Sequence, residues 1–204
     1  MEFIKNLQSL FPITAYVAFI LFLLKELVEF VKKTSGEHRK IQAIKEILSE
    51  ELERNLWAYK VLERTVKDSI KILEEFHNPE FGINRTTTGE ILFWEKFDEN
   101  KNSESSHPLP EVKHEKYESI VLELAQLDKM LFNSARIAYD SIKELAHVRK
   151  SLIEILEDTE KSKVEDLWSG FLGYAESELK NIYKSMNDFY ISIKGKPLTK
   201  HRLR

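Results

Sequence analysis

Apolar residues return every three or four positions over most of the chain, which is the spacing of one face of an α-helix. The first long series begins after Thr34-Ser35-Gly36-Glu37, a stretch with the spacing of a helix-capping box, and it stops at Asn78-Pro79. We therefore expect a helix over about residues 37–77. Its apolar positions are Ile41, Ile44, Leu48, Leu52, Leu56, Tyr59, Leu62, Val66, Ile70 and Leu73.

Two further series follow, and they predict helices over 111–157 and 160–193. The first of them includes Tyr117, Leu124, Leu127, Leu131, Ile142, Leu145 and Leu152, and the second includes Trp168, Phe171, Leu179, Ile182, Met186 and Phe189. Short connections make successive helices antiparallel neighbours. The predicted fold is all-α, an antiparallel bundle of three long helices over 34–193 with coiled-coil-like seams.

Residues 79–110 break the helical pattern. They begin with Ile83, three threonines and Gly89, continue through a short apolar run and end in the polar stretch DENKNSESS. This composition predicts one long inserted loop or a short hairpin. It either caps the bundle or presents an apolar patch to a partner.

The opening of the chain differs again, because the fourteen residues 11–24 carry no charge. A bilayer span needs about 20 apolar residues, but flanking side chains can extend a shorter run. We expect a transmembrane anchor helix over 1–33, and the alternatives are a buried or interfacial helix or a cleaved signal peptide. The residues expected to contact the membrane are Phe11, Tyr16, Phe19, Ile20, Phe22, Leu24 and Lys25.

Basic residues set the expected orientation of this anchor. Lys5 precedes the apolar run, whereas Lys32, Lys33, Arg39, Lys40 and Lys45 follow it. By the positive-inside rule the N-terminus lies outside and the bulk of the chain is cytoplasmic. The expected location is thus the inner or plasma membrane, as a single-pass protein.

Charge is unevenly distributed along the 204 residues. Residues 1–33 have four lysines against three glutamates, and residues 194–204 have five lysines and arginines and no acid, which leaves −9 for residues 34–193 of the overall −3. An acidic body disfavours a nucleic-acid partner. The absence of cysteine excludes disulfides and thiolate sites.

The basic tail 194–204 and the inserted loop meet at the far end of the predicted bundle. Their opposite charges suggest an interaction tip for a protein partner or a second copy of the chain. The residues assigned to this tip are Phe93, Trp94, Phe97, Lys196, Lys200, Arg202 and Arg204. The alternative is a solvated tail without a partner.

Chemical motifs are scarce. Glu74-Glu75-Phe76-His77 and Glu144-Leu145-Ala146-His147 have a spacing used in di-iron bundles, but the antiparallel arrangement separates the two histidines by roughly 45 Å. His77, His107 and His114 could meet near the loop, although their spacing is not specific for a metal. We expect no catalytic, metal or cofactor site.

The stretch Arg54-Asn55-Leu56-Trp57-Ala58-Tyr59 resembles the Arg-Asn-x-x-x-His signature of HEPN ribonucleases, with Tyr59 in place of the histidine. These are helical domains, often toxins or immune effectors that cut RNA as dimers. Two functions follow from the sequence. The first is a membrane-tethered, non-enzymatic interaction or assembly protein, expected to be oligomeric. The alternative is a membrane-associated effector, either HEPN-like through Arg54, Asn55 and Tyr59 or pore-forming.

Overall fold

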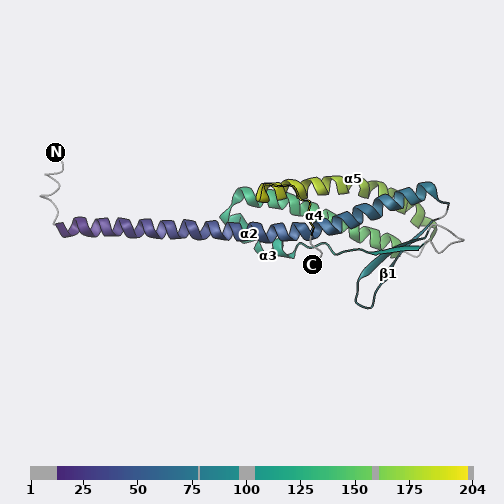
Figure 1. Cartoon of the computed structure of the whole chain (residues 1–204), viewed down its shortest axis with the longest axis horizontal. Coiled ribbons are helices and arrows are strands. Elements are labelled where there is room, and N and C mark those ends of the chain that lie inside the picture. Colours follow the sequence, from purple (N-terminus) through teal and green to yellow (C-terminus); the bar gives the residue numbers. More distant parts are fainter. Residues whose placement is uncertain (1–12, 78, 97–103, 158–160, 202–204) are drawn as a thin grey trace. The chain divides into compact units, whose positions relative to one another are not determined.

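The computed structural model describes most of the chain, namely residues 13–77, 79–96, 104–157 and 161–201. The chain divides into two compact units, Met1–Ala43 and Ile44–Arg204, and helix α2 (Ile13–Glu75) contributes to both. The second unit also contains strands β1 (Glu80–Arg85), β2 (Ile91–Lys96) and β3 (Glu104–Pro108), and helices α3 (Glu115–Leu127), α4 (Lys129–Glu157) and α5 (Lys161–Lys194) (Figure 1). The all-α prediction therefore describes the helical content correctly but misses a small sheet.

Helix α2 passes through Thr34–Glu37 without the expected break. The Thr34 hydroxyl donates a hydrogen bond to the Phe30 carbonyl at 3.0 Å, one turn earlier in the same helix. Threonine makes this bond within helices as well as capping their first turns. Thr34, expected to cap a new helix, thus forms its hydrogen bond within the continuous helix α2.

The predicted transmembrane helix is not supported. Among the residues that the structure describes, no helix combines the length and the apolar character needed to cross a membrane. The described charge-free part of α2, residues 13–24, rises only about 18 Å against a hydrocarbon core of about 30 Å. Lys25, Glu26 and Glu29 follow at once and interrupt the apolar run.

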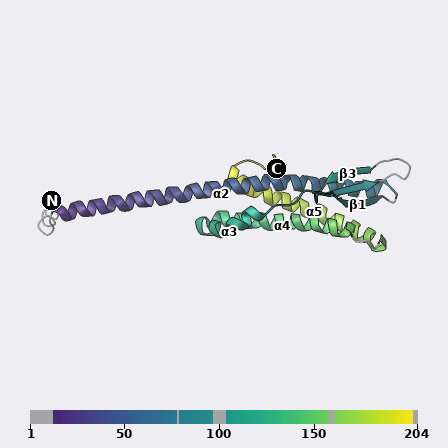
Figure 2. The same ribbon diagram turned by 90° about the horizontal axis from the view of Figure 1, so that it is seen from below.

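The relative directions of the long helices in the second unit differ from the prediction, in which each helix is antiparallel to the one before it. Tyr59 of α2 stacks on Tyr183 of α5 at a ring-centroid distance of 5.3 Å, and Glu46 pairs with Lys194, so these helices are antiparallel. Helices α4 and α5 are also antiparallel, and α4 consequently runs parallel to α2 (Figure 2). The chain returns along α2 through the extended residues 109–114 and the short helix α3.

The helix predicted over 111–157 is two helices because the chain reverses at Asp128. Asp128 has an extended backbone, with φ −150° and ψ 99°. Its carboxylate accepts hydrogen bonds from the N–H groups of Met130 (3.0 Å) and Leu131 (2.9 Å) and so caps the start of α4. The apolar spacing continues across this turn, which is why periodicity alone does not reveal it.

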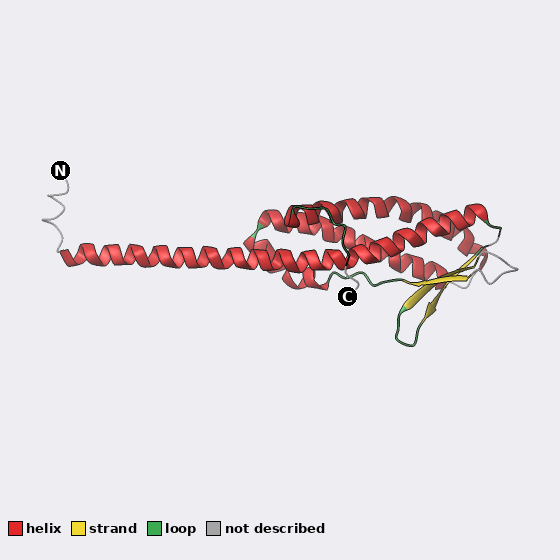
Figure 3. Cartoon of the chain, viewed as in Figure 1, coloured by secondary structure: helices red, strands yellow, loops and turns green. Residues whose placement is uncertain are grey.

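The inserted segment forms a three-stranded antiparallel sheet in the order β1-β2-β3 (Figure 3). Gly89, with φ 83°, occupies the turn between β1 and β2. Phe93 is fully buried, and its ring lies 5.3 Å from that of His107 and 6.2 Å from that of Phe81. Since Phe81 also contacts Trp168 of α5, the inner face of the sheet joins the helical core.

The core of the second unit follows the predicted seams. Leu48, Leu52, Leu56, Leu62, Leu124, Ile142, Leu145 and Leu152 have no exposed surface. The Glu51 carboxylate is buried among them and accepts hydrogen bonds from the N–H groups of Lys116 and Tyr117 and from the Tyr139 hydroxyl. A buried carboxylate with three donors is satisfied, and it fixes the start of α3 against α2 and α4.

Candidate functional site

The apolar stretch of α2 from Val17 to Val31 is uncovered. Its large aliphatic and aromatic side chains are exposed over fractions from 48% at Val28 to 70% at Phe30. They are Val17, Phe19, Ile20, Leu21, Phe22, Leu23, Leu24, Leu27, Val28, Phe30 and Val31. A contiguous apolar surface of this kind marks a site of contact with lipid or with another protein.

The stretch has two parts with different distributions of charge. Phe19 to Leu24 are six successive apolar residues, and at 3.6 residues per turn they occupy the whole circumference of the helix. From Lys25 to Lys33 the charged residues share one side, and Leu27, Val28 and Val31 share the other. Lys25 pairs with Glu29 along the charged side at 3.7 Å.

The expected membrane-contact residues mostly belong to this stretch. Phe19, Ile20, Phe22 and Leu24 are exposed, Tyr16 is half-buried, and Phe11 lies outside the described residues. Lys25, expected to extend toward lipid headgroups, is exposed and forms the ion pair with Glu29.

The three residues of the HEPN-like motif point into different surroundings. Asn55 is fully buried, and its amide donates to the Lys113 carbonyl (2.6 Å) and accepts from the Lys113 N–H (2.8 Å). Tyr59 is buried against Tyr183, and burial followed by the Glu63 carboxylate raises the pKa of its hydroxyl, which therefore stays protonated. Arg54 instead lines a cavity, so the three side chains do not converge within one chain.

Those residues of the expected interaction tip that the structure describes are not brought together. Phe93 belongs to the core, and Trp94 lies over Gly82 of the neighbouring strand. Lys196 and Lys200 are exposed on a tail that follows α2 at the level of Glu46 to Lys60, where the Lys60 amine donates to the Thr199 carbonyl. Phe97, Arg202 and Arg204 lie outside the described residues.

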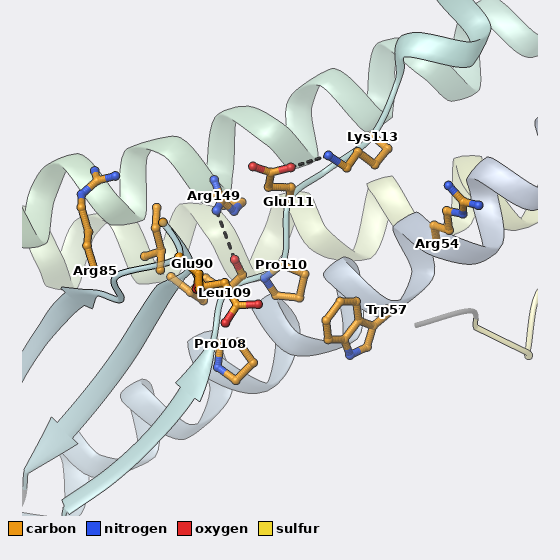
Figure 4. A pocket seen from close by; sticks show the side chains of 13 residues that line it. Arg54, Trp57, Arg85, Glu90, Pro108, Leu109, Pro110, Glu111, Lys113 and Arg149 are labelled. Atoms are coloured by element: carbon orange, nitrogen blue, oxygen red, sulfur yellow. Dashed lines mark hydrogen bonds and ion pairs between the residues drawn. The ribbon is translucent and has the colours of Figure 1, made fainter. Parts of the chain in front are cut away.

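The cavity lined by Arg54 was not foreseen from the sequence. It measures about 540 Å³ and is formed by α2, the β1–β2 turn, the linker between β3 and α3, and α4 (Figure 4). Its charged lining residues are Arg54, Arg85, Glu90, Glu111, Lys113 and Arg149. They are spread over almost a hundred positions of the chain, and no local spacing relates them.

No group of three or more histidine and carboxylate side chains able to hold a metal ion occurs in the described part of the chain. The chain matches no protein-family model, no curated protein and no solved structure.

Proposed function

We propose that the protein is a membrane-tethered, non-enzymatic helical protein that serves in interaction and assembly. The observation that carries the proposal is the uncovered apolar surface of α2 between Val17 and Val31. Moving one large apolar side chain out of water is favourable by roughly 1.5–3 kcal/mol. A surface of this extent therefore gains strongly from an apolar surrounding.

Lipid suits this surface better than a single partner helix does. A partner helix covers one stripe of its neighbour, whereas Phe19 to Leu24 are apolar on every side. Acyl chains can surround the whole circumference. The amphipathic part from Lys25 to Lys33 then suits the boundary of the bilayer, with its charged side toward the headgroups.

The proposed attachment is partial insertion at one face of the membrane. The charge-free part of α2, residues 13–24, is by itself too short to reach across the hydrocarbon core. Basic residues such as Lys32, Lys33 and Arg39 favour the cytoplasmic leaflet, whose lipids carry negative charge.

Vesicle flotation tests the attachment. The full chain is expected to float with phosphatidylcholine vesicles, and more completely when phosphatidylglycerol is added. The double variant Ile20→Asp/Leu23→Asp should remain at the bottom of the gradient, since charge in the acyl region is costly. The matched control Ser35→Asp/His38→Asp adds the same charge to exposed positions of the same helix and should still float. Equal flotation of the two variants would reject lipid contact through this stretch.

Cysteine labelling tests the depth of insertion, and the chain offers a clean background because it has no cysteine. Ser9→Cys and Ser35→Cys variants are reconstituted by adding protein to preformed vesicles and treated with a membrane-impermeant thiol reagent. Position 35 should react from outside, whereas position 9 should stay protected even when the reagent is also enclosed within the vesicles. Reaction of position 9 with enclosed reagent alone would indicate a complete crossing.

Self-association is the second half of the proposal. On the bundle, Leu122, Met130 and Ile137 are exposed over 78%, 84% and 60% of their surfaces. Met130 and Ile137 are seven residues apart and so share one side of α4. Sedimentation of vesicle-free protein in detergent should give a mass above that of one chain. Met130→Glu/Ile137→Glu should lower that mass, and the control Asn133→Glu/His147→Glu, at exposed polar positions of α4, should not.

The pore-forming alternative differs in the mass that it requires. A partially inserted helix cannot enclose a channel by itself, so a pore needs a ring of many copies. A mass of two to four chains together with vesicles that retain an enclosed dye would exclude it.

A further inference from the structure

The cavity between α2, the sheet and α4 concentrates positive charge within an acidic part of the chain. Arg54, Arg85, Lys113 and Arg149 line it against the carboxylates of Glu90 and Glu111, a balance of +2. Residues 34–193 as a whole carry −9. A hollow with charge opposite to that of its surroundings focuses a local field that attracts anions.

Two of the four cations are already paired. An Arg85 guanidinium nitrogen lies 2.7 Å from Glu157 Oε1, and the Lys113 amine contacts the Glu111 carboxylate, the pair drawn as a dashed line in Figure 4. Both pairs are partly exposed. A ligand in the cavity would therefore compete with Glu157 for Arg85 and with Glu111 for Lys113.

The other two cations have donors without acceptors. The Nε atoms of Arg54 and Arg149 are buried, and neither has a hydrogen-bond partner among the described residues. A buried donor left unpaired costs about 1–3 kcal/mol, and an anion in the cavity would remove that cost. Arg149 is held in place by one bond, from its Nη2 to the Leu109 carbonyl at 3.1 Å (Figure 4).

Electrostatics at Arg149 agree with an incomplete site. Burial lowers the pKa of its guanidinium, the nearby charge of Arg85 lowers it further, and Glu111 acts in the opposite direction. A cation that is partly dehydrated and crowded by another cation gains from a new negative partner.

The remaining walls are flat and apolar. Trp57 of α2 is half-buried at the edge of the cavity, and Pro108 at the end of β3 and Pro110 in the linker that follows also line it. An indole face and proline rings form the kind of surface on which a planar ring stacks. The volume of about 540 Å³ falls within the range of small-molecule sites.

We propose that this cavity binds a small phosphorylated molecule carrying a planar ring, of which a nucleoside monophosphate is the simplest example. The guanidinium group of Arg149 takes the phosphate oxygens, because a planar guanidinium fork matches phosphate geometry, and Arg54 adds positive charge from the other side of the cavity (Figure 4). The ring lies against Trp57 and the linker prolines. Lys113 turns from Glu111 toward the bound anion. This proposal uses none of the residues proposed to contact lipid, because all residues that line the cavity belong to the second unit.

Calorimetric titration of the full chain in detergent tests the site with three probes: adenosine 5′-monophosphate, inorganic phosphate and adenosine. The monophosphate should bind more tightly than phosphate, and adenosine should give little heat. Binding should weaken as salt is raised, because the contacts are ionic.

Variants then locate the site. Arg149→Gln should weaken binding of the monophosphate about tenfold, as expected for a lost charged hydrogen bond, and Arg54→Gln should weaken it less, because it removes charge from the other side of the cavity. Lys150→Gln is the matched control: it removes the same charge from the next residue of α4, which is exposed and pairs with Glu154. Glu111→Gln should tighten binding, since it releases Lys113, and a gain of affinity cannot arise from misfolding. Circular dichroism of each variant confirms that the helices persist.

Several results would overturn the proposal. They are the absence of heat from the monophosphate at millimolar concentration, an equal loss with Lys150→Gln and Arg149→Gln, and an unchanged affinity in Glu111→Gln. Citrate binding as tightly as the monophosphate would assign the cavity to carboxylates and overturn the phosphate specificity.

Discussion

Asn55 is the residue that holds the linker between the sheet and α3 against α2. Its side-chain amide donates to the Lys113 carbonyl and accepts from the Lys113 N–H, and Asn55 itself has no exposed surface. Glu51, one turn earlier, accepts hydrogen bonds from the N–H groups of Lys116 and Tyr117 in the first turn of α3. Asn55 thus replaces the ladder bonds that the extended linker lacks, and Glu51 satisfies N–H groups that have no acceptor within α3.

Replacing Asn55 by Ala should lower the free energy of unfolding by about 2–4 kcal/mol, because it leaves a donor and an acceptor of Lys113 buried and unpaired. Urea denaturation followed by circular dichroism measures this. Asn133→Ala, at an exposed position of α4, should change stability by no more than about 0.5 kcal/mol. A loss of the same small size at Asn55 would mean that water reaches the Lys113 peptide.

His107 gives stability a dependence on pH. Its ring nitrogen lies 2.7 Å from the Thr65 hydroxyl, and burial lowers its pKa below the ordinary value of 6.5; the charge of Arg64 lowers it further, and Asp68 opposes this. The unfolded chain therefore binds a proton at higher pH than the folded chain does. Neutral His107 therefore contributes fully to the free energy of unfolding above about pH 6.5, its pKa in the unfolded chain. This contribution is lost as the pH falls from there through the lower pKa of His107 in the folded chain.

We expect the free energy of unfolding to fall more between pH 7.5 and about 5.5 in the unaltered chain than in His107→Gln, which keeps a partner for Thr65 but does not titrate. Glu95 acts in the opposite sense, because burial, followed by Asp68, raises its pKa, although Ser105 and Arg64 lower it. Its stabilising contribution is lost as the pH rises from about 4.5 through the folded pKa. Comparing the two chains cancels that effect. Identical pH slopes would show that His107 is solvated in the folded state.

At the scale of elements, the sheet depends on one close approach between neighbouring strands. A Cβ atom at Gly82 would clash with the Trp94 ring, whereas a Cβ at Gly170 in α5 would meet nothing within 4 Å. The absence of a side chain is required at Gly82 but not at Gly170. In the strand it makes room for an aromatic ring, and in the helix it only adds flexibility to the unfolded chain.

The same substitution at the two glycines should therefore have opposite signs. Gly82→Ala should destabilise the protein by about 1–3 kcal/mol through the clash with Trp94. Gly170→Ala should stabilise it by up to about 1 kcal/mol through helix propensity. Thermal melting of both variants measures the difference, and the interpretation fails if Gly82→Ala melts at or above the temperature of the unaltered chain.

At the scale of the whole second unit, the basic tail is part of the folded structure up to its described end. Gly195, with φ 69°, turns the chain after α5, and Leu198 is then buried with 1% of its surface exposed. The Leu198 N–H donates to Asn187 Oδ1 at 2.9 Å. The tail therefore stabilises the bundle in addition to carrying charge.

Ending the chain at Gly195 should lower the free energy of unfolding by about 2–5 kcal/mol, and Leu198→Ala alone should account for most of that loss. Lys200→Ala, an exposed position of the same tail, should have little effect. Denaturation of the three variants checks this order. Equal stability of the truncated and complete chains would mean that Leu198 does not pack in solution.

The sequence by itself determined where helices occur and which of their faces are buried. Leu48, Leu52 and Leu56 repeat at helical spacing and are buried, because local periodicity is enough to define an apolar face. It also identified the apolar stretch near the N-terminus, because a long charge-free run has few local alternatives.

Only the tertiary structure decided how those helices are connected and what their polar residues do. The reversal at Asp128 depends on a cap that leaves the apolar spacing intact, and it makes α4 parallel to α2. The tail lies at the level of Glu46 to Lys60 as a consequence, not at the end predicted for it. The cavity joins Arg54, Arg85 and Arg149 from three elements, and a pattern along one chain cannot encode contacts that arise only when distant segments pack together.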